Sequence, residues 1–87
     1  MVDIEFIDEF VEEVRGFNVV LSNWALEGDY DVEEFNSYRD KLSGYLESMG
    51  EDDLMAACKV LDYYEWNSLF EADLASPGQI NDLYRHL

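Results

Sequence analysis

Apolar residues recur along most of this chain at three- and four-residue steps, the spacing of one face of an α-helix. The most regular run lies in 32–49, where the successive steps are 3, 4, 3 and 4 (Phe35, Tyr38, Leu42, Tyr45 and Met49). Asp31 precedes this run and is suited to cap a helix, and Gly50 follows it as the expected stop. The pattern therefore predicts a helix over 32–49.

The first third of the chain contains two segments, and only the first has an unambiguous helical pattern. Residues 3–15 predict a helix that begins at Asp3, because their apolar residues form one stripe (Ile7, Phe10, Val11 and Val14). Gly16 is the expected stop or kink. Residues 17–26 fit either a further helical stripe or a short strand. We favour a helix, because a lone strand would leave its backbone groups unpaired.

The second half predicts further short helices. Asp52 is expected to open a third helix that ends near Tyr64, and Asn67 to cap a short one after it. Ser76-Pro77 combines an N-cap residue with proline at the first helical position, a strong start signal. A length of 87 residues supports one domain. We therefore predict an all-α fold: residues 1–87 form a small single-domain bundle of four to six short helices.

Composition changes this picture from an ordinary helical bundle to a strongly acidic one. The chain has 21 Asp and Glu against 5 Lys and Arg, a net charge of -16. It is also 48% hydrophobic and 15% aromatic, which a disordered acidic tail would not be. The charge excludes direct nucleic-acid binding through a basic surface and attraction to anionic membranes. No apolar run approaches the roughly 18 residues of a membrane span, so no membrane partner is expected.

The residues that usually carry catalysis are scarce. Cys58 and His86 are the single cysteine and the single histidine, so neither a disulfide nor a zinc site can be built from them. Cys58 lies on the apolar stripe of the third predicted helix, which favours a buried thiol whose pKa an acidic field raises. His86 is next to the last residue and is expected to be solvated. We expect no enzymatic activity, no metal and no cofactor.

The acidic residues themselves are the candidate site. In the helix expected over 32–49, Glu33, Asp40 and Glu47 recur every seven residues, which places them nearly in line about 10.5 Å apart. Glu5, Glu9 and Glu12 share a face of the first helix, with Asp8 and Glu13 beside them. The acids predicted to bind a partner are Asp29, Asp31, Glu33, Glu34, Asp40, Glu47, Glu51, Asp52, Asp53, Asp62, Glu65, Glu71 and Asp73.

The density of this charge decides between two interpretations. Charged helix faces usually serve solubility, for which a net charge of about 2–8 suffices. A folded chain of this mass exposes about 5,300 Å², or about 330 Å² for each net negative charge. Concentrated on half the surface, the charge would come within a factor of two of duplex DNA, which carries about one charge per 107 Å² when taken as a cylinder of about 10 Å radius. This favours a partner with a positively charged groove that normally holds nucleic acid.

Aromatic residues offer a second kind of candidate. Tyr30, Tyr63 and Trp66 fall in or near predicted loops and are candidate exposed anchors for a partner. The other aromatics on helical stripes are expected in the core: Trp24, Phe35, Tyr38, Tyr45, Phe70 and Tyr84. The alternative function is thus a small acidic phage or plasmid adaptor or regulator that binds a basic protein through an aromatic-centred patch.

Residues 31–74 resemble the helical part of the ArdA-type antirestriction proteins. The resemblance rests on a helix with a Phe35-Asn36 start, the acidic connection 50–53, and the Ala-rich helix 54–61 followed by a short aromatic helix. It covers about half of the chain, and the run SPGQINDLYRHL is similar to another helix start of that family.

This resemblance implies a DNA mimic that occupies the DNA-binding groove of type I restriction enzymes, carried by plasmids, transposons and phages. Small acidic anti-CRISPR proteins share this strategy. We therefore expect an inhibitor without catalysis that binds a positively charged nucleic-acid-binding protein or complex. The expected location is the cytoplasm of a bacterial host, because the acidic start MVDIEF lacks the basic region of a signal peptide. A homodimer is left open.

Overall fold

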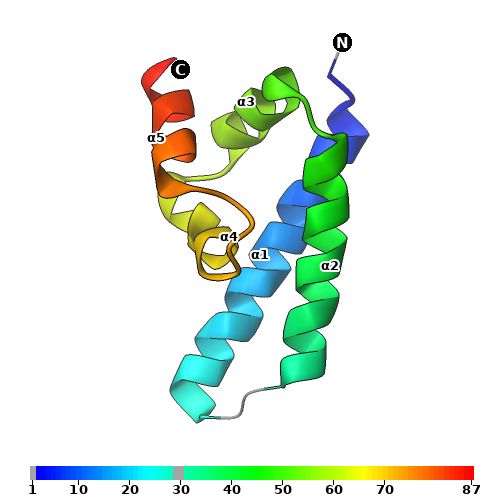
Figure 1. Ribbon diagram of the computed structural model, residues 1–87, viewed down its shortest axis with the longest axis vertical. Coiled ribbons are helices and arrows are strands. Elements are labelled where there is room, and N and C mark those ends of the chain that lie inside the picture. The colour runs from blue at the N-terminus through cyan, green and yellow to red at the C-terminus, as the bar shows by residue number, and fades with distance from the viewer. Residues whose placement is uncertain (1, 29–30) are drawn as a thin grey trace.

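The computed structural model describes residues 2–28 and 31–87. Over these ranges it contains five α-helices, one 3₁₀ turn and no strand, which confirms the predicted all-α bundle. In chain order they are α1 (Ile4–Glu27), α2 (Val32–Ser48), α3 (Glu51–Val60), η1 (Tyr63–Trp66), α4 (Asn67–Glu71) and α5 (Pro77–Arg85). Figure 1 shows α1 and α2 as an antiparallel hairpin, with the shorter elements packed beside the upper part of α1.

The first helix is longer than predicted. Asp3 caps α1 as expected, because its carboxylate accepts the backbone N–H groups of Glu5 and Phe6 at 3.1 and 3.3 Å. The helix ends at Gly28, whose left-handed φ of 78° suits a residue without a side chain. The expectation of a stop at Gly16 is wrong, since the helix runs through it and includes 17–26. A Cβ atom at Gly16 would lie 3.0 Å from the Tyr38 hydroxyl, so the glycine lets α2 approach closely.

Aromatic contacts join the two long helices. Asp31 caps α2 as predicted, and Leu42 is buried at the middle of the helix. The rings of Phe17 and Tyr38 stack with their centroids 5.2 Å apart, and Phe10 meets Tyr45 at 6.0 Å. The aromatics expected in the core are half-buried at its edge: Trp24, Phe35, Tyr38, Tyr45, Phe70 and Tyr84.

Helix boundaries in the second half differ from the prediction by a few residues. Gly50 is the N-cap of α3, and its backbone N–H donates to the Asp53 carboxylate at 3.1 Å. The helix starts at Glu51 instead of Asp52 and ends at Val60, four residues before Tyr64, since η1 intervenes. Asn67 is the first residue of α4 rather than its cap. Ser76 and Pro77 begin α5 as expected.

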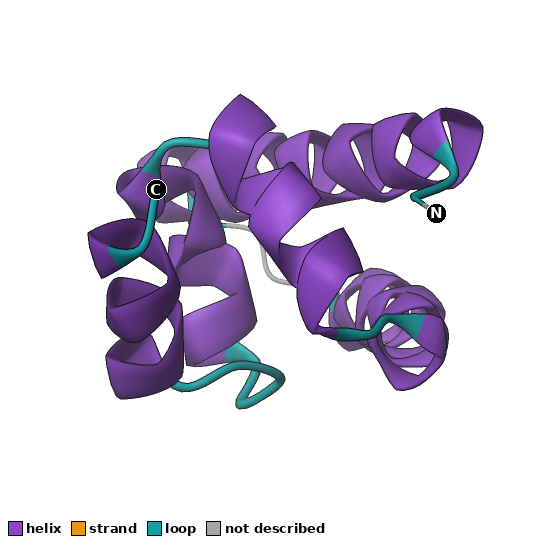
Figure 2. Cartoon of the chain, turned by 90° about the horizontal axis from the view of Figure 1, so that it is seen from above, coloured by secondary structure: helices purple, strands orange, loops and turns teal. Residues whose placement is uncertain are grey.

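The core lies where α1 packs against α2, α3, η1 and α4, and α5 packs on α3 and η1. Its fully buried large side chains include Phe10 and Phe17 from α1 and Trp66 from η1. Viewed from above, short loops join the helices and the two ends of the chain lie on opposite sides of the molecule (Figure 2). The molecule is elongated, with extents of 40 × 23 × 18 Å. No helix within 2–28 and 31–87 is long and apolar enough to cross a membrane.

Candidate interaction surface

The first half of α1 and its cap carry a long run of negative charge. Between Asp3 and Glu13 there are six acidic residues and no lysine or arginine. Ten helical steps rise about 15 Å, so the run holds about one carboxylate per 2.5 Å of axis. Duplex DNA carries one phosphate per 3.4 Å of each strand. These acids are absent from the predicted partner-binding set, although their clustering could be recognised in the sequence.

Five of these acids lie on one face of α1. At about 100° per residue, they span an arc of about 140° opposite the buried stripe. The acids are Glu5, Asp8, Glu9, Glu12 and Glu13, and the buried residues are Ile7, Phe10, Val11, Val14 and Phe17. Packing of the apolar stripe against the core therefore fixes the direction in which the carboxylates project. Only Glu13 among the five is half-buried.

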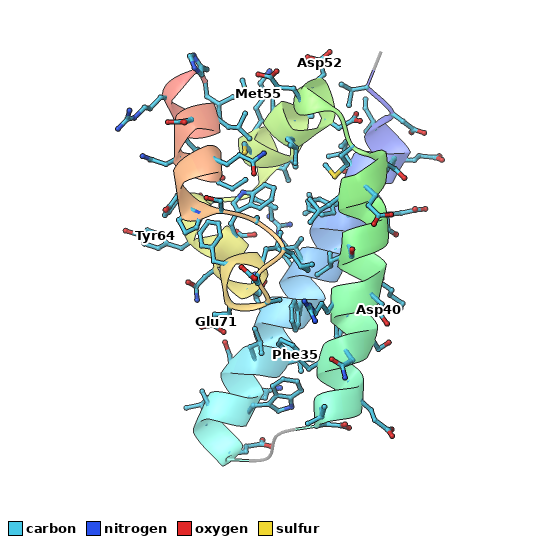
Figure 3. All side chains as sticks on the ribbon, viewed as in Figure 1. Phe35, Asp40, Asp52, Met55, Tyr64 and Glu71 are labelled. Atoms are coloured by element: carbon cyan, nitrogen blue, oxygen red, sulfur yellow. The ribbon has the colours of Figure 1, made fainter. Side chains whose placement is uncertain are left out.

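The predicted row on α2 is exposed along its length. Glu33, Asp40 and Glu47 all lie on the side of α2 away from the buried Leu42, about 10.5 Å apart along the axis. Asp40 projects outward from α2 in Figure 3. Its neighbours along the chain are Arg39 and Lys41, so the row is less uniformly negative than the run on α1.

A shallow hollow of about 420 Å³ lies between α1 and α2, beside Glu9 of the α1 row. Its walls are Phe6 and Glu9 from α1 and Lys41, Gly44, Tyr45 and Ser48 from α2. Burial raises the pKa of the Tyr45 phenol, and the nearby Glu9 and Glu13 carboxylates raise it further. The negative potential of α1 therefore reaches into the hollow. On α2 the row lies opposite the residues that pack against α1, so the two rows point in different directions. We call the two rows together, Glu5, Glu9, Glu12, Glu33, Asp40 and Glu47, the acidic hairpin face.

The remaining predicted acids are not brought to this face. Glu51, Asp52, Asp62, Glu71 and Asp73 are exposed on α3, around η1 and on or after α4. Figure 3 shows Asp40, Asp52 and Glu71 projecting in different directions from three different helices. Glu34 is exposed in the first turn of α2, and Asp29 lies outside the described residues.

Four predicted acids accept hydrogen bonds within the fold, among them Glu71, which accepts from Asn67 Nδ2 at 3.3 Å. Asp31 caps α2, and Asp53 accepts the Gly50 N–H at the start of α3. Glu65 forms an ion pair with Arg15, whose Nε lies 3.0 Å from Glu65 Oε2. Because these carboxylates already accept protein donors, they are less available to a partner than the free acids of the hairpin face.

The structure corrects the aromatic candidates. Trp66 has no exposed surface, so the prediction that it is an exposed anchor is wrong. Residues three apart in a 3₁₀ turn share a side, so η1 turns both Tyr63 and Trp66 inward. Tyr63 is half-buried against Phe70 and Tyr84, whereas Tyr64 is 84% exposed. Tyr30 lies outside the described residues.

The thiol and the imidazole lie apart from this surface. Cys58 is buried as predicted, and burial raises its pKa to about 11, while a hydrogen bond with Tyr84 acts in the opposite direction. The leading cause is thus burial and not the acidic field. His86 is exposed at the end of α5. The described part of the chain holds no group of three or more His, Cys, Asp or Glu side chains arranged to hold a metal ion.

The chain matches no protein-family model, and comparison with curated proteins and with solved structures finds no match.

Proposed function

We propose that this protein is an acidic DNA mimic that occupies the nucleic-acid-binding groove of a host defence enzyme without catalysing a reaction. The acidic hairpin face is the observation that carries the proposal. Its carboxylates project from two packed helices at spacings of the same order as those of backbone phosphates. The target class is a restriction or CRISPR-type complex, as the resemblance to antirestriction proteins suggests.

The amount of charge supports this use. A net charge of -16 on a surface of 5643 Å² is about one negative charge per 350 Å², averaged over the whole molecule. Along the first half of α1 the linear density rises to about one per 2.5 Å, between a single DNA strand and a duplex. Self-repulsion of this size destabilises the compact state, so solubility alone is a poor reason for it.

Binding would proceed by electrostatic steering and steric occupancy. A basic groove attracts the acidic face at long range, which raises the association rate and makes it fall with added salt. Burial of Phe10 and Phe17 holds α1 in place, so little ordering of the acidic row is needed on binding. The proposed setting is the cytoplasm of a bacterial host that carries a phage or a plasmid.

A displacement assay tests the proposal. A fluorescent DNA duplex is bound to purified type I restriction and CRISPR effector complexes, and the protein is titrated in at low and at moderate salt. We expect release of the duplex by at least one complex, at lower protein concentration in low salt. If none of the complexes releases its DNA at either salt concentration, the proposal is wrong.

The exposure of Tyr64 favours one alternative, an acidic adaptor that binds a basic protein through an aromatic-centred patch. Tyr64 is 84% exposed, and tyrosine is a frequent anchor at interfaces. Replacing Tyr64 by alanine separates the two proposals. Loss of all binding to a captured basic partner by Tyr64→Ala, with unchanged binding after charge reversal of the hairpin face, would favour the adaptor.

A further inference from the structure

The second half of α1 differs from the rest of the molecule because it carries no charge before its last residue, Glu27. Residues 16–26 contain eleven consecutive uncharged positions in a chain that is 30% charged. This part of the helix projects beyond α3, α4 and α5 toward the closed end of the hairpin (Figure 1). Val19 and Leu26 are 59% and 84% exposed, and Ser22 lies between them on the same helical stripe. The exposed surface here is uncharged, and Val19 and Leu26 are its large apolar side chains.

A hollow of about 480 Å³ adjoins this stripe. Its α1 wall includes Leu21 and Ala25, and its α4 wall includes Asn67, Ser68 and Glu71. Ser68 is only 1% exposed, and its hydroxyl has no hydrogen-bond partner among the described residues. Buried hydroxyl groups are normally paired, so this wall has an unused donor and acceptor.

Acidic residues lie near the apolar stripe and the hollow. Glu27 ends α1, Glu71 lies on the α4 wall, and Glu33 follows the half-exposed Val32 at the start of α2. An apolar centre with a charged rim is the usual anatomy of a protein–protein interface. The complementary surface has an apolar centre and a cationic rim.

We propose that this surface, the apolar end of α1 (Val19, Leu21, Ser22, Ala25 and Leu26) with the α4 hollow, docks an amphipathic helix of the target whose apolar side chains are flanked by lysine or arginine. The identity of that target rests on the proposed function, but the chemistry of the segment follows from the apolar end itself. A second copy fits this surface poorly, because it would bring another net charge of -16 and the same acidic rim against the first.

The docking site and the acidic hairpin face would affect different steps of binding. Long-range attraction by exposed acids mainly sets the association rate and weakens in salt. Apolar contacts at the centre of an interface mainly slow dissociation and persist in salt. The apolar end would therefore hold the complex together after the acids have guided it.

Two synthetic helical peptides test this proposal with the intact chain. Both carry the same lysines, but one has leucines on its apolar face and the other has serines there. Fluorescence anisotropy at moderate salt should show the leucine peptide binding at least about tenfold more tightly. The double variant Val19→Ser with Leu26→Ser should remove this difference. Ile4→Ser is the matched control, because Ile4 is 74% exposed at the opposite end of α1.

Other outcomes would overturn the proposal. The proposal is wrong if the two peptides bind equally. It is also wrong if the double variant and Ile4→Ser lose equal affinity for the leucine peptide. Sedimentation of the native chain as a dimer that the double variant abolishes would assign the surface to a second copy instead. Circular dichroism checks that each variant stays folded. Failure of the DNA displacement assay would reject the proposed function and leave the peptide result standing.

Discussion

The hydroxyl oxygen of Tyr84 lies 3.1 Å from the indole Nε1 of Trp66 and accepts its proton. The same hydroxyl donates to the backbone carbonyl of Leu61. This chain of hydrogen bonds connects α5, η1 and the residue after α3. A buried indole N–H needs an acceptor, so Tyr84 is what allows Trp66 to be fully buried at the centre of the core.

Replacing Tyr84 by phenylalanine should therefore destabilise the protein. The change removes the acceptor of the Trp66 indole and the donor to Leu61, and buried groups left unpaired cost about 1–3 kcal/mol. Urea denaturation followed by tryptophan fluorescence measures the free energy of unfolding. Tyr64→Phe is the control, because Tyr64 is exposed and its variant should stay within about 0.5 kcal/mol of native. Equal stabilities of the two variants would contradict the role given to Tyr84.

Alkaline pH should destabilise the protein through the buried Cys58 thiol and the half-buried Tyr84 phenol. Burial raises the pKa of Cys58 from 9.0 to about 11 and that of Tyr84 from 10.0 to about 12. Between the unfolded and folded values, the folded chain keeps protons that the unfolded chain has released, so the free energy of unfolding falls as pH rises.

The fall should begin near pH 9, be steepest between pH 10 and 11 where both groups contribute, and finish near pH 12. Each group contributes up to about 1.4 kcal/mol per pH unit. Urea denaturation at steps from pH 8 to 12 measures this dependence, and Tyr84→Phe should lack the part above pH 11. A stability that does not change across this range would be inconsistent with the buried thiol and phenol.

Two helical glycines should respond differently to alanine. Gly44 is exposed in α2 with no atom within 4 Å of an added Cβ, so Gly44→Ala should stabilise the protein by about 0.5–1 kcal/mol. Gly16→Ala should gain less, because its Cβ would lie 3.0 Å from the Tyr38 hydroxyl. Combining Gly16→Ala with Tyr38→Phe should restore the gain. Thermal unfolding distinguishes these cases, and equal gains at both glycines in the native background would show that the close approach of α2 is unimportant.

Removing the unpaired hydroxyl of Ser68 should stabilise the fold. An unsatisfied buried hydroxyl costs about 1–3 kcal/mol, so Ser68→Ala should raise the free energy of unfolding by about 1 kcal/mol. Ser22→Ala, on an exposed position of α1, is the control and should change stability only slightly. Urea denaturation of the three proteins makes the comparison. A loss of stability in Ser68→Ala would mean that the hydroxyl has a partner in solution.

Much of the fold could be predicted because the apolar residues follow the helical period. The steps in α2, the cap at Asp31 and the Ser76-Pro77 start are local signals, and local signals suffice for helices that bury one stripe. The stop predicted at Gly16 was wrong because a glycine inside a helix costs only about 1 kcal/mol. The packing of α1 along its whole length outweighs that cost. The exposure predicted for Trp66 was wrong because a single 3₁₀ turn has too few residues to show a hydrophobic period.

The candidate site could be predicted only in part for a related reason. Exposure of an acid on a helix follows from its position opposite the apolar stripe, as for Glu33, Asp40 and Glu47. Which exposed acids share a face depends on how helices pack, and Asp52 and Glu71 project elsewhere. The uncharged stretch 16–26 was visible in the sequence, but its exposure follows from the short reach of α3, α4 and α5 along α1.

The most direct test of the account compares two triple variants of equal charge in the DNA displacement assay. One carries Glu5→Lys, Glu9→Lys and Glu12→Lys on the acidic hairpin face. The other carries Asp52→Lys, Asp62→Lys and Asp82→Lys, which are exposed elsewhere. Both lower the net negative charge by the same amount, so only the position of the reversed charges differs. The account predicts that the first variant loses at least about tenfold in inhibition and the second keeps most of it. Equal inhibition by the two variants would contradict a DNA-like role for the hairpin face.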